Sequence, residues 1–211
     1  MTTTHDPAIL HLSNADARLG ALIARVGPCL ITARVSETDH FEGLVRAITS
    51  QQLSTKAAAT IFARVKALGL DETGRFHPAT LLAQDETSLR AAGLSGQKTR
   101  YVRDVCEKVC SGVLDFDALH AIDDDAVIEA LCSVKGVGRW TAEMFLMFRL
   151  GRPDVLPVGD LGIQKGFMRL FNLRTMPTAE KMVKLAKPFR PYRSAACWYL
   201  WRLTEEKATG T

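Results

Sequence analysis

The stretch LCSVKGVGRWTAEMF, residues 131–145, contains two apolar, helix-like segments that are separated only by the glycine turn GVG. The first helix is expected to end at about Cys132, and the second is expected to begin near Arg139. Gly136 and Gly138 lack a Cβ atom, so both can adopt a positive φ and let another backbone approach closely. A turn this tight is seldom needed merely to reverse a chain, and it therefore suggests a binding site.

The turn has the features of a phosphate-binding site. A helix that begins directly after it would present unpaired N–H groups and the positive end of its dipole. Lys135 and Arg139 would add positive charge on either side. An ordinary corner between two helices, with glycine caps, would have the same GxG pattern. The turn alone therefore leaves both interpretations open.

Composition and charge favour a globular protein that acts inside the cell. The chain has 211 residues, of which 47% are hydrophobic and 24% are charged. No apolar run approaches the roughly 20 residues of a membrane span, and the first residues lack the pattern of a signal peptide. Five scattered cysteines do not resemble a disulfide framework. We therefore expect a cytoplasmic protein without a membrane partner, and we take a monomer as its working state.

The distribution of apolar residues predicts an all-α fold. They recur at helical spacing almost throughout, as in the stripe Phe41, Leu44, Val45 and Ile48, and no segment alternates over the length of a strand. The net charge of +4 permits a nucleic-acid partner. Basic residues outnumber acidic ones after Leu161, so the C-terminal third could face a polyanion.

The surroundings of the glycine turn carry a family resemblance. The string L-x-x-V-K-G-V-G-x-W-T-A-E resembles the helix-hairpin-helix of the DNA glycosylases that share this hairpin and a following Gly/Pro/Asp element. Residues 156–160 read LPVGD, which is similar to that family's proline, glycine and catalytic aspartate segment. Within the superfamily the sequence is most similar to the alkylpurine branch, 3-methyladenine DNA glycosylase II, from about Phe41 to Glu205.

The resemblance implies both an architecture and an activity. It implies two helical lobes with the active-site cleft between them. Residues 38–152 would carry the helix-hairpin-helix, and residues 1–37 plus 153–211 would carry the catalytic aspartate. The implied activity is that of a monofunctional hydrolase that flips alkylated purines, such as 3-methyladenine or 7-methylguanine, out of double-stranded DNA. Cleavage of the N-glycosidic bond would leave an abasic site and start base excision repair.

The expected chemistry depends on Asp160. On its own, an aspartate that opens the segment DLGIQKGFMRLF is most simply a helix N-cap. The resemblance makes it the catalytic carboxylate as well, which would stabilise a positively charged sugar or orient the attacking water. The two roles would compete for its oxygens.

Base flipping requires a wedge and a pocket. By resemblance Gln52 has the intercalating position, where some relatives carry leucine, with Leu53 beside it; a polar loop with Leu53 in the core is the alternative. Trp140 and Trp201 match aromatic positions beside the flipped base, and Met144 replaces an aromatic residue found there in some relatives. An aromatic face attracts a cationic purine by roughly 1–2 kcal/mol. Core packing is the alternative for either tryptophan.

The hairpin is expected to bind the DNA backbone, and the residues implied are Lys135, Gly136, Gly138, Arg139 and Thr141. By resemblance it could also hold a monovalent cation, Na⁺ or K⁺, through the backbone carbonyls of Cys132, Val134 and Val137.

Two absences narrow the expected chemistry. Relatives that also cut the DNA backbone carry a lysine nucleophile two residues past the second glycine, and here that position is Trp140. The cysteines lack the spacing C-x6-C-x2-C-x5-C, because only Cys197 follows Cys132. We therefore expect no Schiff base, no iron–sulfur cluster and no required cofactor.

Two other functions stay open. One is a sibling glycosylase for mismatched or oxidised bases, although neutral bases usually require more hydrogen-bonding groups in the pocket. The other is a helix-hairpin-helix protein that binds DNA without catalysis, although phosphate binding alone would require neither Asp160 nor the paired tryptophans.

Overall fold

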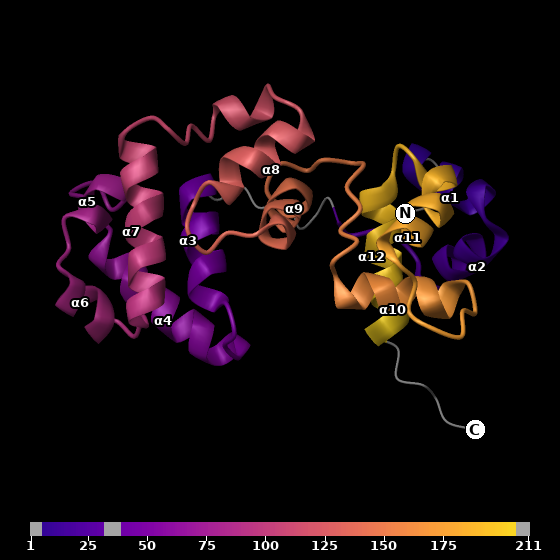
Figure 1. The fold of residues 1–211 in the computed structure, drawn as a ribbon, viewed down its shortest axis with the longest axis horizontal. Helices are drawn as coiled ribbons and strands as arrows, with labels where there is room; N and C mark the ends of the chain where they lie inside the picture. The colour runs from indigo at the N-terminus through magenta and orange to yellow at the C-terminus, as the bar shows by residue number, and fades with distance from the viewer. Residues whose placement is uncertain (1–5, 32–38, 206–211) are drawn as a thin grey trace. The chain divides into compact units, whose positions relative to one another are not determined.

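The computed structural model describes residues 6–31 and 39–205 of the chain (Figure 1). Within these ranges the regular structure is helical, apart from one isolated bridge between Leu70 and Phe76. The all-α prediction is therefore confirmed. No helix in the described ranges is both long and apolar enough to cross a membrane.

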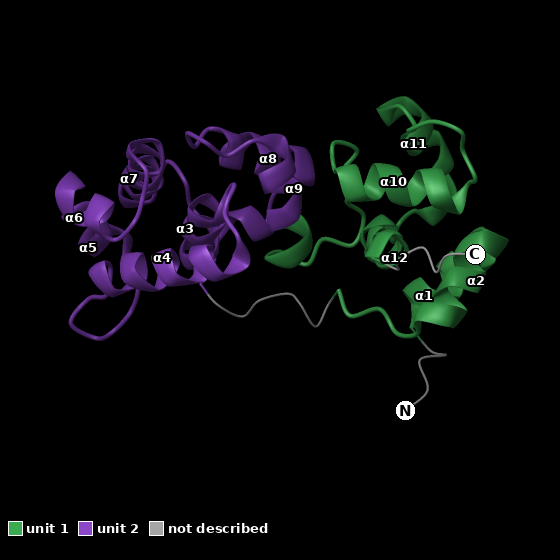
Figure 2. Cartoon of the chain, turned by 90° about the horizontal axis from the view of Figure 1, so that it is seen from below, with its two compact units in different colours: residues 1–36, 146–211 green, residues 37–145 purple. Residues whose placement is uncertain are grey.

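The chain divides into two compact units (Figure 2). Unit 2, drawn in purple, covers residues 37–145. Its helices are α3 (His40–Ser50), α4 (Thr55–Leu68), α5 (Pro78–Leu82), α6 (Glu86–Ala91), α7 (Gly96–Cys110), the short η3 (Ala118–His120), α8 (Asp124–Cys132) and most of α9 (Arg139–Phe148).

Unit 1, drawn in green, covers residues 1–36 and 146–211. Its helices are α1 (Pro7–Ala15), α2 (Ala17–Val26), α10 (Leu161–Leu170), α11 (Ala179–Leu185), the short η4 (Lys187–Phe189) and α12 (Arg193–Glu205). The expected lobe boundary between residues 37 and 38 lies outside the described residues. The other expected boundary followed residue 152, whereas the units divide after Phe145, because the last residues of α9 pack within unit 1.

The core of unit 2 is built on the apolar face of α3. Phe41, Leu44 and Ile48 of this face are buried, and the ring of Phe41 stacks on Phe76 with 5.1 Å between centroids. Helix α3 packs against α4 and α7, which Figure 1 shows in the same part of the unit. Residues 51–54, here called the wedge loop, connect α3 to α4. The packing of these two helices therefore determines where the loop lies.

The core of unit 1 brings α10 and α12 into close contact. A Cβ atom at Gly166 would lie 2.7 Å from the Cβ of Leu200, so only glycine permits this approach. Phe167 is fully buried, and so is Tyr199, whose hydroxyl donates to the carbonyl of Gly27 at 2.9 Å. This packing positions the first turn of α10 beside the second half of α12.

Candidate active site

The turn between α8 and α9 is a compact hairpin. The amide of Val134 donates to the carbonyl of Leu131, and the amide of Val137 donates to the carbonyl of Val134, each at 3.1 Å. Gly136 has a φ of 80°, and a Cβ atom there would overlap the ring of Tyr101. Both backbone conformation and space therefore require glycine at this position.

Gly138 is able to adopt a positive φ but does not do so, and no atom lies within 4 Å of the place where a Cβ would be. The missing side chain therefore leaves open space in front of α9 instead of relieving backbone strain. Such space suits the close approach of another backbone, which stays a prediction.

Lys135 is anchored by Asp104, a residue not selected from the sequence. The amide of Lys135 donates to Oδ2 of Asp104 at 2.9 Å, and its ammonium lies 3.3 Å from Oδ1. Burial alone would raise the pKa of Asp104, but hydrogen bonds from Lys135 and Lys108 outweigh burial and lower this pKa below its usual value. The charged carboxylate therefore holds the hairpin to α7.

Arg139 is exposed and paired within its own helix. Its Nε lies 3.0 Å from Oε1 of Glu143, whose exposed fraction is only 4%, and its guanidinium lies 3.9 Å from the exposed Asp125. Thr141 is half-buried in the same turn of α9. Glu143 therefore orients the guanidinium and balances part of its charge.

The wedge loop is hydrogen-bonded to the hairpin. Nε2 of Gln51 donates to the carbonyl of Gly136 at 2.9 Å. Gln52 is exposed and has a φ of 58°, which is uncommon for a residue with a side chain. The side chain of Leu53 is also exposed, so the alternative that placed it in the core is wrong.

Asp160 caps α10. Its Oδ1 accepts hydrogen bonds from the amide of Ile163 at 2.8 Å and from the indole Nε1 of Trp201 at 2.9 Å. Its own amide donates to the carbonyl of Pro157 at 3.0 Å, which closes the LPVGD turn. Capping the helix and binding the indole therefore involve the same carboxylate oxygen.

Trp201 is held by ring stacking as well as through its indole nitrogen. Its ring stacks on Phe148 with 5.9 Å between centroids. A Cβ atom at Gly162 would lie 2.8 Å from Cδ1 of Trp201, so glycine leaves the room that the indole needs to reach Asp160. The structure thus brings together Trp201 and Asp160, both of which were predicted from the sequence to be site residues.

Trp140 and Met144 lie on α9 in unit 2, whereas Asp160 and Trp201 belong to unit 1. Trp140 is 50% exposed, so it is not a core residue, and Met144 is half-buried. Their part in a base pocket stays a prediction.

The three carbonyls suggested for a monovalent cation lie at the end of α8 and in the hairpin. Val134 already accepts the amide of Val137, but a carbonyl oxygen has two lone pairs and can bind an ion as well. Cys132 is the last residue of α8, where helical carbonyls lack partners further along the helix. Over residues 6–31 and 39–205, no three His, Cys, Asp or Glu side chains form a group that could hold a metal ion.

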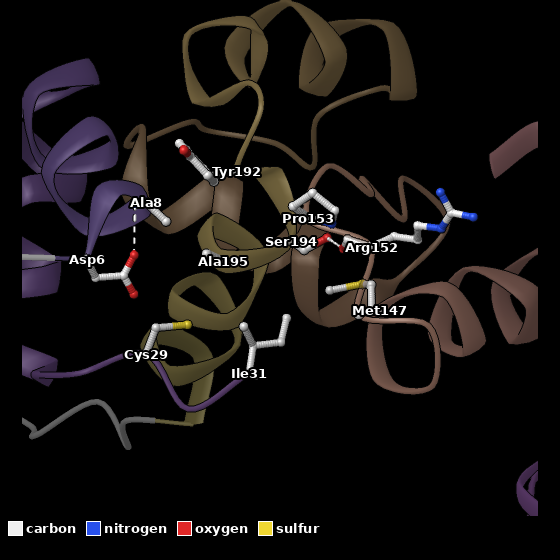
Figure 3. A pocket seen from close by; sticks show the side chains of 11 residues that line it. Asp6, Ala8, Cys29, Ile31, Met147, Arg152, Pro153, Tyr192, Ser194 and Ala195 are labelled. Atoms are coloured by element: carbon white, nitrogen blue, oxygen red, sulfur yellow. Dashed lines mark hydrogen bonds between the residues drawn. The ribbon is translucent and has the colours of Figure 1, made fainter. Parts of the chain in front are cut away.

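A separate cavity of about 220 Å³ lies within unit 1 (Figure 3). Neither Asp160 nor Trp201 lines it; Asp6, Cys29 and Tyr192 do, among mostly apolar groups. Burial raises the pKa of the Cys29 thiol to about 11, so at neutral pH this sulfur is not a nucleophilic thiolate. The Cys29 thiol therefore does not provide a ready nucleophile in this cavity.

Comparison with known proteins identifies the family. Residues 45–191 match the HhH-GPD superfamily, described as base excision DNA repair proteins. The chain belongs to this superfamily. The matching segment contains the wedge loop, the hairpin and Asp160, whereas Trp201 lies beyond it.

Relatives of this HhH-GPD protein are similar over nearly its whole length. It is 34% identical over 207 residues to DNA-3-methyladenine glycosylase 1 of Schizosaccharomyces pombe, covering 97% of this chain and 90% of the relative. A solved structure of the S. pombe 3-methyladenine DNA glycosylase Mag1 in complex with abasic DNA has a TM-score of 0.82 and 35% identity, covering 98% and 100%. DNA-3-methyladenine glycosidase from Bacillus halodurans has a TM-score of 0.86 and 38% identity, covering 97% and 92%.

Several residues that position the HhH-GPD site were not selected from the sequence. Lys98, Tyr101 and Asp104 follow one another at intervals of three along α7, and this spacing places them on one helix face. The spacing by itself indicates that the three side chains share a helix face. It does not indicate which residues these side chains contact, because those residues lie in the wedge loop and the hairpin, far away in the chain.

Proposed function

We propose that this HhH-GPD protein is a monofunctional DNA glycosylase that excises alkylated purines and so initiates base excision repair. The observation that carries the proposal is the hydrogen bond between Trp201 and Asp160, which orients a carboxylate at the first turn of α10. The relatives that match nearly the whole chain are named 3-methyladenine DNA glycosylases, and this supports the substrate class.

In the proposed reaction, the bond between the purine nitrogen and C1′ of the sugar breaks, and its electron pair leaves with the base. An alkylated purine is already cationic, so it departs as a neutral base and needs little acid catalysis. The carboxylate of Asp160 stabilises the oxocarbenium-like sugar. Water then adds to C1′ and loses a proton, which leaves an abasic site. No Schiff base forms, because Trp140 stands where backbone-cutting relatives have lysine.

The flipped base would be recognised mainly by its charge. The rings of Trp140 and Trp201 would offer their faces to the cationic purine, and Met144 would complete an apolar wall. Trp201 therefore has two roles in the proposal, since its nitrogen also orients Asp160. Because a ring face attracts any cationic purine, we expect several alkylated purines to be accepted.

The proposed partner is double-stranded DNA that contains a damaged base. The solved relative in complex with abasic DNA supports this partner. Gln52 and Leu53 would enter the base stack, and the backbone would be held by Lys135, Gly136, Gly138, Arg139 and Thr141. A Na⁺ or K⁺ ion on the carbonyls of Cys132, Val134 and Val137 would add positive charge beside a phosphate. No other cofactor belongs to the proposal, in which the protein acts as a cytoplasmic monomer.

One assay tests this function against its alternatives. The protein is incubated with duplexes that carry a methylated purine, an oxidised purine or a mismatched base, and heating in alkali then cuts any abasic site. Release of free methylpurine by the native protein, but not by Asp160→Asn, is the expected result. Release of only another base would replace the proposal with a sibling glycosylase. Tight binding without release would indicate a non-catalytic DNA-binding protein.

A further inference from the structure

Lys98 holds the wedge loop through hydrogen bonds, and the proposed function assigns no role to this lysine. Lys98 lies in the first turn of α7, and its Nζ donates to the carbonyls of Thr49 and Gln51, each at 2.7 Å. Carbonyls at the C-terminal end of a helix lack partners within the helix and attract positive charge. The ammonium of Lys98 therefore caps the C-terminal end of α3.

Burial lowers the pKa of Lys98, as expected for an ammonium partly removed from water. The two carbonyls replace part of its hydration. They lie at the end of α3, where the helix dipole favours a cation, so the contact satisfies both the lysine and the helix.

A second anchor holds the same loop residue through its side chain. Gln51 donates from Nε2 to the carbonyl of Gly136, whose position is set by its positive φ and by the ring of Tyr101. Tyr101 and Asp104 lie one and two turns after Lys98 on the same helix. One face of α7 therefore holds both the wedge loop and the hairpin.

The hydrogen bond from Lys98 to the carbonyl of Gln51 restrains the backbone of Gln52. The carbonyl oxygen of Gln51 lies in the peptide plane that joins Gln51 to Gln52, so a bond from Lys98 to this oxygen restrains the φ of Gln52. That φ of 58° is rare for a residue with a Cβ atom and persists only where the surroundings hold it. The exposed side chain of Gln52 thus projects from a backbone that Lys98 keeps in place.

We propose that Lys98 is a positioning residue for base extrusion, which holds the peptide between Gln51 and Gln52 so that Gln52 enters the DNA stack. This inference rests on the proposed function. It assigns Lys98 to the opening of the duplex and not to bond cleavage, because its ammonium is bound to two carbonyls of the protein itself.

The test compares a substrate that must be opened with one that is already open. Single-turnover excision of the same methylated purine is measured in a duplex and in a single strand of the same sequence. For Lys98→Met we expect the duplex rate to fall by about tenfold or more, the effect of losing hydrogen bonds from a charged donor. The single-strand rate should stay within about twofold of the native value, since an unpaired base costs least to extrude.

Two further variants complete the comparison. Lys184→Met removes one charge from an exposed position on α11 and should leave both rates unchanged, which controls for net charge. Gln51→Ala removes only the side-chain anchor and should show the same duplex-selective loss, which keeps the test decisive if Lys98→Met does not fold. Fluorescence of 2-aminopurine beside an abasic-site analogue, which rises when the stack opens, should rise less with Lys98→Met.

Two results would overturn the assignment. Equal losses on duplex and single strand would show that Lys98 only supports the fold, and a native duplex rate in Lys98→Met would show that the wedge loop does not depend on it. A native protein that releases no methylpurine from either substrate would instead refute the proposed function, and this inference with it.

Discussion

The indole Nε1 of Trp201 lies 2.9 Å from Oδ1 of Asp160, although the two residues are 41 positions apart in the chain. The same oxygen accepts the amide of Ile163, so one hydrogen bond comes from α10 and the other from α12. Two donors from different helices orient the carboxylate more firmly than a helix cap alone would. The packing of α10 against α12 is therefore part of the candidate active site.

Replacement of Asp160 by asparagine should remove catalysis without unfolding the protein. The amide oxygen can still accept from Ile163 and Trp201, so the cap is retained, but the negative charge is lost. We expect single-turnover release of methylpurine to fall by at least about 100-fold. Thermal unfolding and binding to DNA with an abasic-site analogue should change little. A variant with the native excision rate would show that the catalytic carboxylate lies elsewhere.

Trp201→Phe should separate the effect of the indole hydrogen bond on the excision rate from the effect of ring stacking. Phenylalanine can still stack on Phe148, but it cannot donate to Asp160, so we expect the rate to fall about tenfold. Trp198→Phe is the matched control, because the buried Nε1 of Trp198 has no hydrogen-bond partner among the described residues. Its excision rate should be unchanged. Equal rate losses in the two variants would indicate a packing effect and not the loss of a specific bond.

The two glycines of the hairpin should respond differently to alanine. Gly136→Ala combines a positive φ with overlap of the Tyr101 ring, so we expect it to lower the free energy of unfolding by about 1–3 kcal/mol. Gly138→Ala meets neither obstacle and should change that free energy by less than about 0.5 kcal/mol, while weakening DNA affinity. Urea denaturation and fluorescence-anisotropy titration measure the two quantities. Native DNA affinity in Gly138→Ala would argue against backbone contact there.

Asp104→Asn should destabilise the protein at neutral pH by on the order of 2 kcal/mol, because it removes the charged partner of Lys108 and Lys135. The folded-state pKa of Asp104 is lowered, so its contribution to stability is present above the unfolded value of about 4. That contribution is lost as the pH falls through the lower folded pKa. The difference between native protein and variant, measured by urea denaturation, should therefore shrink as the pH falls below about 4. A difference independent of pH would contradict this origin.

The elements of the fold follow from local patterns that are readable in the chain. Asp160 opens α10 as an N-cap because its side chain bonds an amide three residues later, which requires no other helix. The same holds for the hairpin, since the amide of Val137 bonds Val134 within the turn. The glycine pattern indicates that Gly136 and Gly138 can each adopt a positive φ, but it does not indicate which of them does, and in the structure only Gly136 has one.

The sequence by itself determined the helical fold, the hairpin and the aspartate that caps α10, because each depends on residues only a few positions apart. Only the tertiary structure decided that Trp201 binds Asp160, that Lys98 holds Gln51 and that Asp104 holds the hairpin. These contacts join segments distant in the chain, and their distances depend on how closely whole helices pack. No local pattern of residues encodes the distance between two packed helices.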